Sequence, residues 1–480
     1  YFDPLRGMNI AAGNDPENFK SGQNQFRFLG SLSVEYTPFA VLSLKGEAGA
    51  DFVNARNYYW VSDVIRYNRY ASESNSSIRN LTGSVYATWK PTMTKGHRLT
   101  TVAGAEWQQS THRRQIYAFE GLVGSQQEMG EIASGEQMLI AVGGIFPEQG
   151  FVSFFMRNHY DFEKKYFISA SIRRDGSSVF APGKRFGTFP SVSAGWVLTE
   201  APFLTNSFIS RSFSFFKLRA SYGQTGNAGI PAFGFVSNFV NWPIYGQSTA
   251  LALSVLGNPE IRWEKNNQLD AGFDWTLRSG RLRGVVDVFS RTTRDMLLSV
   301  PVAPTVGIGA GSQSAVVNIG DLRNKGVEME LSWVVKENFK TPRRLKWTVD
   351  ANLTLVKNKV LWLTNFLNTL PVGEFPVANG IQQGVTLTQT GQNLANYYLA
   401  TYAGLDSEGF ETIYEIDRQI LRQTGRTVHT GRRLRATIAN VNNNRTIQYG
   451  KSGLPTWYGG VTQSLKWRIW EVRMHFTFQG

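Results

Sequence analysis

The sequence predicts an all-β protein, a large antiparallel transmembrane β-barrel with short periplasmic turns and long extracellular loops. Three observations predict this fold: apolar and polar residues alternate along many segments, those segments have the length of membrane-spanning strands, and the connections between them are sorted by length. The composition agrees, because aromatic residues make up 13% of the 480 residues and 47 residues are glycine. Such a composition suits many strands that are joined by turns and carry rings at interfaces.

The alternation is clear around residue 330. Val327, Met329 and Leu331 fall on one face of the expected strand, and Glu328 and Glu330 fall on the other. The same alternation recurs in 80–90, 281–291 and 471–478. It indicates strands with one apolar and one polar face. Strands of a soluble sandwich alternate too, so this pattern alone does not separate the two classes.

From this pattern we predict about fourteen strands of about 9–13 residues each, close to the span that a tilted transmembrane strand needs. They lie near 26–36, 41–53, 79–90, 98–110, 151–162, 166–174, 187–198, 213–223, 266–277, 281–291, 325–335, 345–356, 459–467 and 470–478.

Short and long connections take turns along the chain. The short ones are 37–40, 91–97, 163–165, 278–280, 336–344 and 468, with 199–212 as an intermediate case on the same side. The long ones are 54–78, 111–150, 175–186, 224–265, 292–324 and 357–458. Antiparallel strands give this order when one barrel end has tight turns and the other has large loops, whereas a soluble sandwich has no reason to sort its loops. In the longest connection, residues 397–402 and 413–414 predict an extra hairpin.

The extent of the chain leads to a further expectation. No stretch approaches the roughly 18 uninterrupted apolar residues of a membrane helix, so a helical membrane protein is excluded. Tyr1-Phe2-Asp3-Pro4 has neither the basic start nor the apolar core of a signal peptide. Barrels with a plugged lumen reach about 22 strands. We therefore expect residues 1–480 to form one barrel domain that is incomplete at both ends.

The charge balance is basic, with 50 Lys and Arg against 36 acidic residues and a net charge of +14. The basic residues are dispersed, and the densest group has no aromatic stacking platform beside it in the sequence: Arg422, Arg426, Arg432, Arg433 and Arg435. Nucleic-acid binding is therefore not predicted. A solvated loop is the simpler interpretation of this group, and attraction to anionic lipid headgroups or an anionic solute is the functional alternative.

The sequence offers no catalytic motif. Cysteine is absent, which excludes disulfides and thiolate chemistry and fits an envelope compartment. The five histidines are scattered singly, so no metal site is predicted. Gly450-Lys451-Ser452 lacks the first glycine of a phosphate loop, and Asp406-Ser407-Glu408-Gly409 lacks the later ligands of a calcium loop. We predict a non-enzyme with no cofactor, although spacing alone leaves open an enzyme built from separated carboxylates.

Several blocks, in order, resemble a known family. They are Arg157-Asn158-His159-Tyr160, Lys165-Tyr166-Phe167, Arg173-Arg174-Asp175-Gly176-Ser177-Ser178, Phe189-Pro190-Ser191-Val192-Ser193-Ala194-Gly195-Trp196, Lys217-Leu218-Arg219-Ala220-Ser221-Tyr222-Gly223-Gln224-Thr225-Gly226-Asn227, Asn258-Pro259, Trp263-Glu264 and Asn324-Lys325-Gly326-Val327-Glu328. Gly404-Leu405-Asp406 and Gly459-Gly460 fit the later part. This order resembles the barrel of SusC/RagA-type TonB-dependent transporters over most of 150–480. Ser407 and Glu408 depart from the family's turn composition.

The resemblance implies import of an oligosaccharide or peptide nutrient across the cell outer membrane. It also implies a SusD-like surface lipoprotein partner and contact with the TonB complex through a plug region that this chain lacks. Outer-membrane lipid would surround the barrel. Two alternatives stay open: a structural or docking β-barrel subunit of a larger envelope complex without transport, and a passive porin.

Within the blocks, local chemistry gives two smaller expectations. Asp175-Gly176 is expected in a turn, because this pair permits positive φ. Phe189 and Trp196 are expected to face lipid near an interface, where amphipathic rings are favoured.

The candidate substrate site lies in one external loop and consists of Asn238, Asn241, Trp242 and Tyr245. A glycan presents hydroxyls and apolar C–H faces, which suit aromatic platforms beside amide side chains. The net charge of +14 would instead suit an acidic peptide or uronic-acid polymer. We favour an oligosaccharide because aromatic and amide side chains lie together here, although Trp242-Pro243 also suits a purely structural staple.

The long loops are rich in apolar and aromatic residues, namely Tyr58, Tyr59, Trp60, Trp242, Tyr245 and 361–363. Exposed apolar patches commonly mark protein contacts, which predicts binding of a lid-like lipoprotein. Loops that pack on their own neighbours are the alternative.

Overall fold

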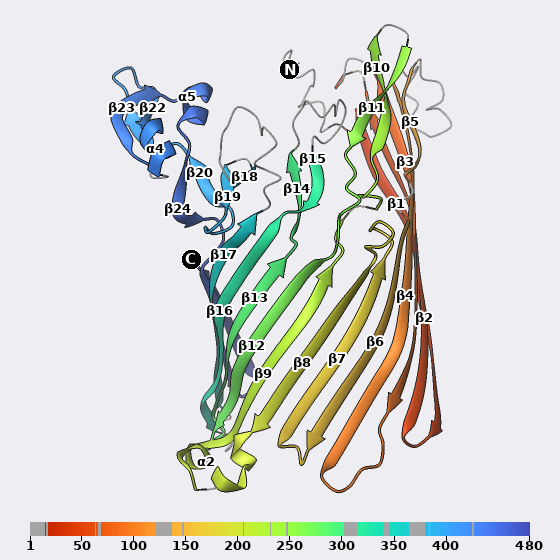
Figure 1. The fold of residues 1–480 in the computed structure, drawn as a ribbon, viewed down its shortest axis with the longest axis vertical. Coiled ribbons are helices and arrows are strands. Elements are labelled where there is room, and N and C mark those ends of the chain that lie inside the picture. The colour runs from red at the N-terminus through yellow and green to blue at the C-terminus, as the bar shows by residue number, and fades with distance from the viewer. Residues whose placement is uncertain are drawn as a thin grey trace.

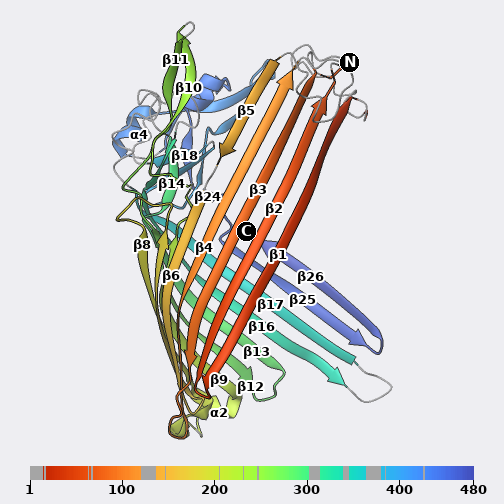
Figure 2. The ribbon, with the colours of Figure 1, turned by 90° about the vertical axis from the view of Figure 1, so that its right-hand side faces the viewer.

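One large antiparallel sheet dominates the computed structural model (Figure 1). The structure describes residues 15, 18–62, 64–65, 69–120, 137–145, 148–204, 206–230, 232–245, 248–301, 314–338, 345–363, 380–383, 385–424 and 427–480. The sheet has 15 strands in the order β1-β2-β3-β4-β6-β7-β8-β9-β12-β13-β16-β17-β25-β26, with β5 pairing beside β4. Among the described strands, β1 and β26 are the sheet's two edges, and Figure 2 shows how strongly the sheet twists between them.

The strands of this sheet have the following bounds: β1 Phe19–Phe39, β2 Leu42–Val61, β3 Tyr70–Trp89, β4 His97–Glu120, β5 Gln137–Ile145, β6 Glu148–Phe162, β7 Tyr166–Ser177, β8 Phe186–Val197, β9 Phe213–Asn227, β12 Glu264–Leu277, β13 Leu282–Arg294, β16 Gly320–Asn338, β17 Leu345–Leu363, β25 Trp457–Trp467 and β26 Trp470–Gln479. Every predicted strand overlaps one of these, so the all-β prediction is confirmed.

The prediction of 54–78 as a long loop is wrong in large part. β2 continues to Val61 and β3 begins at Tyr70, so Tyr58, Tyr59 and Trp60 lie in a strand. Trp60 is buried against Ala71 rather than exposed in a loop. The backbone ladder continues beyond the stretch where apolar and polar residues alternate, and alternation was the only signal available in the sequence.

The connections are sorted between the two ends of the sheet (Figure 1). At the short-turn end, strands are joined by tight turns such as Glu163 to Lys165, and by a connection with the short helices η2 Leu198–Glu200, η3 Pro202–Leu204 and α2 Phe208–Ser212. Part of the predicted turn 336–344 lies outside the described residues. Within the part of the chain that the structure describes, no helix is both long and apolar enough to cross a membrane.

The opposite end, called the long-loop end below, carries additional secondary structure. Two hairpins stand there: β10 Asn238–Tyr245 with β11 Ser248–Val255, and β14 Leu297–Pro301 with β15 Ser314–Asn318. Two small sheets and two helices lie between β17 and β25 in sequence: β18 Gly380–Gln383, β19 Thr386–Gln389, β20 Asn396–Leu399, β21 Tyr402–Leu405, β22 Glu411–Ile416, α4 Arg418–Thr424, β23 His429–Arg435, α5 Ile438–Asn443 and β24 Thr446–Ser452. We call residues 385–456 the loop-end layer. Its β21–β22 pair, with Tyr402 opposite Ile413, confirms the predicted extra hairpin.

Strand register gives the large sheet two chemically different faces. Opposite residues such as Val288, Val327 and Leu355 share one face, and it carries exposed apolar side chains along many strands. The next residues along the strands alternate to the other face, where Arg219, Asp274 and Asp287 meet. Outer-membrane barrels are apolar outside and polar inside, so we call these the outer face and the inner face.

Aromatic rings collect on the outer face at the short-turn end. They are Trp89, Tyr166, Trp196, Trp275, Trp333, Trp347, Trp467 and Trp470, which we call the aromatic girdle. Tyr166 lies opposite Trp196, and their rings stack with centroids 6.0 Å apart. Amphipathic rings favour the membrane–water interface, so the girdle marks one boundary of the apolar band. The expectation for Trp196 fits this position.

Candidate functional site

The inner face carries an arginine that joins three strands. Arg219 of β9 donates from Nε to Asp274 Oδ1 of β12 at 2.9 Å and from Nη2 to Asp287 Oδ2 of β13 at 2.6 Å. Arg219 and Asp287 are not on neighbouring strands, so the guanidinium reaches across β12. Charge-assisted bonds of this forked kind fix geometry as well as charge.

Gly272 makes that reach possible. It lies opposite Arg219 on one side and Asp287 on the other. A Cβ on Gly272 would collide with the Asp287 carboxylate and would lie 2.5 Å from the Val286 carbonyl oxygen. The glycine therefore leaves the space through which the Arg219 and Asp287 side chains meet.

A second arginine repeats this arrangement on β7. Arg173 donates to Asp175 at 2.7 Å on its own strand and to Glu106 of β4 at 2.7 Å, two strands away. The residue between them is the small, fully buried Ser153, whose hydroxyl accepts a bond from Arg173 at 2.8 Å. The expected turn at Asp175-Gly176 is wrong, because β7 continues through both residues to Ser177. Asp175 is buried and paired with Arg173 instead.

At the Arg219 cluster the inner face forms a polar recess of about 240 Å³. Its lining includes His159, Ser169, Lys217, Arg219 and Asp287. His159 Nδ1 lies 2.7 Å from Ser169 Oγ, and Lys217 Nζ lies 4.7 Å from the centre of the Phe167 ring. The recess therefore presents both charges and neutral hydrogen-bonding groups to the lumen side of the sheet.

A buried apolar cluster lies on the inner face near the long-loop end. Phe189 is only 5% exposed and packs on Trp263, with ring centroids 5.5 Å apart. Phe180 packs on the same Trp263 ring at 5.1 Å, and the Trp263 indole donates to the Arg185 carbonyl at 2.9 Å. The expectation that Phe189 faces lipid is wrong, because its strand parity turns it inward. The cluster fixes the loops after β7 and before β12 to the strands.

The four predicted substrate residues all lie on β10. Asn238, Asn241, Trp242 and Tyr245 pair with Val255, Leu251, Ala250 and Ser248 of β11. This hairpin stands at the long-loop end (Figure 1), and Asn238 is exposed. The side chains of Asn241, Trp242 and Tyr245 lie outside the described residues, so their joint role in substrate binding stays a prediction.

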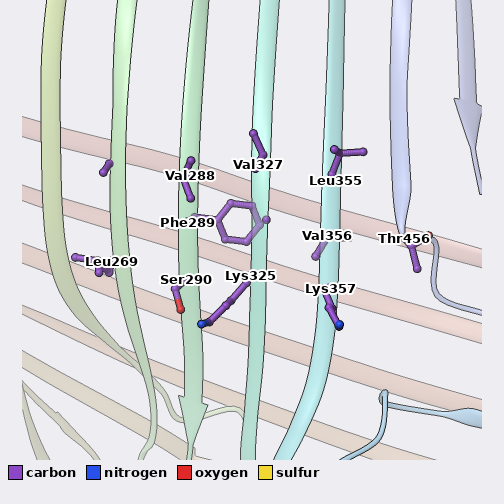
Figure 3. A pocket seen from close by; sticks show the side chains of 12 residues that line it. Leu269, Val288, Phe289, Ser290, Lys325, Val327, Leu355, Val356, Lys357 and Thr456 are labelled. Atoms are coloured by element: carbon purple, nitrogen blue, oxygen red, sulfur yellow. The ribbon is translucent and has the colours of Figure 1, made fainter. Parts of the chain in front are cut away.

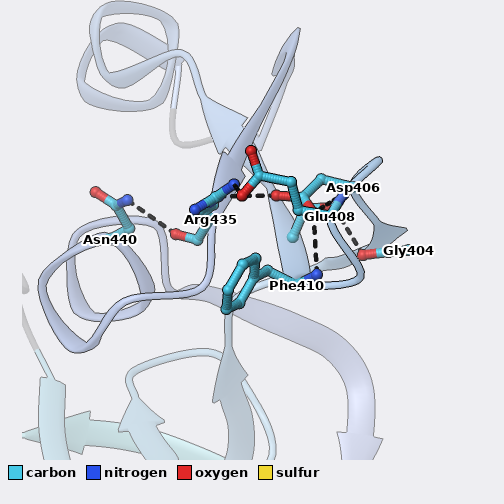
Figure 4. Close-up of polar contacts among 7 residues, drawn as sticks. Gly404, Asp406, Glu408, Phe410, Arg435 and Asn440 are labelled. Carbon is cyan, nitrogen blue, oxygen red and sulfur yellow. Dashed lines mark hydrogen bonds and ion pairs between the residues drawn. The ribbon is translucent and has the colours of Figure 1, made fainter.

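The loop-end layer is organised around Arg435 (Figure 4). Arg435 Nε donates to Asp406 Oδ2 at 2.8 Å, its Nη2 pairs with Glu408, and its guanidinium lies 4.4 Å from the centre of the Phe410 ring. Sequence reasoning found no aromatic neighbour for this arginine group, and for Arg435 that was wrong. Phe410 lies 25 residues away in sequence and meets Arg435 only because β22 pairs with β23.

Asp406 closes the β21–β22 turn by accepting backbone hydrogen bonds. Its Oδ1 accepts from the amides of Phe410 at 3.0 Å and Glu408 at 2.9 Å. The Phe410 amide, the Glu408 amide and Arg435 together hold the pKa of Asp406 below its ordinary value of 3.8. Gly409 takes φ +85 in this turn, a conformation that disfavours other residues. The carboxylate is thus a turn and ion-pair residue rather than part of a calcium loop.

Across the described residues, no group of three or more His, Asp or Glu is placed to hold a metal ion. The inner face offers polar groups suited to a passing solute, and the long-loop end offers an exposed surface.

Comparison with known proteins shows which family this barrel sheet belongs to. A family model described as TonB dependent receptor-like, beta-barrel matches residues 2–474. The chain belongs to this family. It is an outer-membrane protein, and its named relatives are receptors and importers rather than enzymes.

A TonB-dependent receptor of Formosa agariphila is 28% identical over 371 residues, covering 75% of this chain and 35% of the relative. The TonB-dependent receptor SusC of Bacteroides thetaiotaomicron is 27% identical over 386 residues, with coverage of 75% and 35%. The RagAB peptide importer in its closed-closed state superposes with a TM-score of 0.78 at 23% identity, over 96% of this chain and 48% of that chain, and so shares the fold. The chain therefore spans about a third of the length of these curated relatives.

The alternation in the sequence places the inner-face clusters on the polar side of their strands. Arg173, Arg219 and Asp287 all fall on the polar face of predicted strands. Their partners, two strands away, depend on strand order and register. The pairing could therefore be read only after the sheet order was known.

Proposed function

We propose that the full-length receptor imports an oligosaccharide or peptide nutrient through the barrel lumen, driven by the TonB complex. The inner face carries this proposal. It combines charged clusters at Arg173 and Arg219 with the polar recess beside Arg219, on a barrel of the TonB-dependent receptor family. Such a lining can pass a polar solute by exchanging hydrogen bonds. Residues 1–480 are proposed to be the barrel domain, and the plug is proposed to belong to a part of the full-length receptor other than these residues.

A SusD-like surface lipoprotein is the proposed partner at the long-loop end. Apolar side chains of the loop-end layer are exposed there, among them Tyr402, Leu405, Phe410 and Ile438, the last at 83%. Exposed apolar side chains gathered in one layer are typical of a protein contact. Of the aromatic residues that the sequence suggested on β2, Trp60 is buried within the sheet and is left out of this surface, whereas Tyr58 and Tyr59 are exposed.

The partner contact is tested with Leu405→Asp and Ile438→Asp in the full-length receptor at native expression. Both are expected to reduce co-purification of the lipoprotein. Ile469→Asp is the matched control, because Ile469 is 90% exposed in a tight turn at the opposite end. Equal recovery of the lipoprotein with all three variants would show that the loop-end layer is not the contact surface. If the unmodified receptor is recovered without any lipoprotein, the proposed partner is rejected.

For cargo, we favour an oligosaccharide on the strength of the β10 residues. Trp242→Ala and Tyr245→Ala are expected to lower glycan uptake. Phe239→Ala is the control, since Phe239 is an exposed aromatic residue of the same strand outside the predicted set. Uptake is measured for a glycan panel and a peptide panel in cells with and without TonB.

Three outcomes separate the alternatives. Unchanged glycan uptake in both variants together with peptide uptake would reject the glycan assignment. Uptake that persists without TonB would indicate a passive porin. No uptake of any solute by a correctly inserted receptor would favour the docking barrel.

A further inference from the structure

Six basic side chains lie together on the outer face, at the long-loop edge of the apolar band. They come from four neighbouring strands and form what we call the basic band: Lys265, Arg294, Arg323, Lys325, Lys357 and Lys359. Register places them in opposed pairs, since Lys265 lies opposite Arg294, Arg323 opposite Lys359, and Lys325 opposite Lys357. All six lie on the long-loop side of the apolar outer-face residues of their strands. On β16 and β17 the two kinds of residue adjoin, since Lys325 is next to Val327 and Lys357 is next to Leu355 on the outer face.

No member of the basic band makes an ion pair with a described residue. Arg323 donates to the Thr292 hydroxyl at 3.3 Å, and five of the six side chains are exposed. Like charges directly opposite one another on adjacent strands are destabilising, because their Cβ atoms are only about 5 Å apart. The band therefore places uncompensated positive charge at the edge of an apolar surface.

The inner face carries a lysine pair whose positive charges are balanced by nearby carboxylates, and it serves as a comparison. Lys346 and Lys466 are also directly opposite, on β17 and β25. There Lys346 pairs with Glu337 at 3.2 Å and Lys466 pairs with Glu471 at 3.8 Å. The Lys325–Lys357 pair has no such carboxylate among the described residues. It is thus suited to receive an anion from outside the protein.

An open groove of about 580 Å³ adjoins these two lysines. Its lining includes the outer-face side chains of Leu269, Val288, Val327 and Leu355. Figure 3 shows the apolar residues Val288, Val327 and Leu355 at one end of the groove and the ends of Lys325 and Lys357 at the other. Lysine stems can lie along apolar surface while the ammonium groups reach the polar boundary.

We propose that the groove and the basic band bind a phosphorylated, acylated lipid of the membrane leaflet at the long-loop end. Acyl chains would lie against Leu269, Val288 and Leu355, and phosphate groups would accept hydrogen bonds from Lys325 and Lys357. A basic peptide or a neutral lipid would leave the positive charges uncompensated. A nucleic acid would leave the apolar groove empty. This site lies on the opposite face from the proposed import path and does not depend on it.

The test measures lipid binding to the full-length receptor, purified in a non-ionic detergent and stripped of lipid. Native mass spectrometry titrates lipid A, its dephosphorylated form and inorganic phosphate. The double variant Lys325→Gln with Lys357→Gln is expected to bind lipid A about 30-fold more weakly, since each lysine near an anionic surface contributes about a factor of five. Lys346→Gln with Lys466→Gln is the matched control and should change binding less than about twofold. Lys325→Arg with Lys357→Arg keeps the charges and should retain binding.

Binding of dephosphorylated lipid should be weak and insensitive to all variants. Unchanged lipid A binding in the glutamine double variant would overturn the proposal, and so would equal affinity for the dephosphorylated lipid. Inorganic phosphate bound as tightly as lipid A would overturn the lipid assignment. Heat-modifiable migration on gels confirms that each variant is a folded barrel. If the double variant does not fold, the single variants are expected to show about fivefold losses.

Discussion

On β16, the outward Met329 and the inward Glu330 are neighbours in sequence and belong to different surroundings. Met329 lies midway between the aromatic girdle at Trp333 and the basic band at Lys325, opposite Val286 and Leu353. Glu330 faces the polar lumen side. The outer face consists of many interchangeable apolar contacts, whereas the inner face depends on a few specific arginine clusters. The effect of a substitution should therefore follow its face more than its residue type.

The largest contrast is expected between the two ends that bound these faces. Residues 1–480 contain no cysteine, so a single introduced cysteine is the one thiol to label in this part of the receptor. Ser407→Cys in the loop-end layer should be labelled by an impermeant maleimide on intact cells. Ser279→Cys, in the tight turn between β12 and β13, should be labelled only after the outer membrane is opened. The reverse pattern would exchange the assignments of the two ends, with the short-turn end outside the cell.

A charge in the middle of the outer face should be the most destabilising single change. Met329→Arg places a guanidinium near the membrane midplane and should lower the free energy of unfolding by about 2–4 kcal/mol. The neighbouring Glu330→Arg should change it by less than about 0.5 kcal/mol, as for other solvent-facing positions. Urea unfolding of the full-length receptor in lipid vesicles measures both. Similar losses for the two variants would mean that the faces are wrongly assigned.

On the inner face the sensitive position is a glycine rather than a charge. Gly272→Ala should lower the free energy of unfolding by about 1–3 kcal/mol. The new methyl group would overlap both the Asp287 carboxylate and the Val286 carbonyl oxygen, so both groups would have to move away from it. Gly46→Ala in β2 is the matched control, since nothing lies within 4 Å of its added Cβ. The same unfolding measurement applies. An equal response at both glycines would show that Arg219 does not need the space above Gly272.

The smallest effect is expected in the loop-end layer, which belongs to neither face. The folded-state pKa of Asp406 is lowered below 3.8, so its stabilising contribution is present above about pH 4 and is lost as the pH falls through the lowered value. Below that pH, hydrogen exchange at the Glu408 and Phe410 amides should accelerate relative to free peptides at the same pH. Arg435→Gln should move this transition to higher pH. A transition that does not move would mean that the turn amides alone set the pKa of Asp406.

The sequence predicted the strands well because lipid imposes a strict alternation on them. All fourteen were found, as was the hairpin near Tyr402. Prediction failed where that constraint ends. β4 runs for 24 residues, well beyond the span of a bilayer, because two strands continue to pair in water without an apolar face. Phe189 and Arg435 were misjudged because each contacts a residue that is distant in sequence, Trp263 and Phe410 respectively. Asp175 was misjudged because β7 continues past the end of the alternating stretch.

The candidate site was predicted less completely than the fold. The four predicted substrate residues lie together on β10 at the long-loop end, and their binding role rests on residue type alone. The clusters around Arg173 and Arg219 depend on which strands lie two apart in the sheet. Period-two alternation gives the face of a residue but not its lateral neighbours.

Gly272 also has a consequence for how the barrel is assembled. If β12 paired one residue out of register, either Ala271 or Phe273 would occupy the place between Arg219 and Asp287. The Phe273 ring would then stand between the two charges, and the whole apolar set of β12 would turn from lipid to water. Arg219 of β9 can reach Asp287 of β13 only when glycine, which has no side chain, lies between them on β12. The Arg219–Asp287 contact is therefore compatible with the observed alignment of β12 and not with the two alignments that are shifted by one residue.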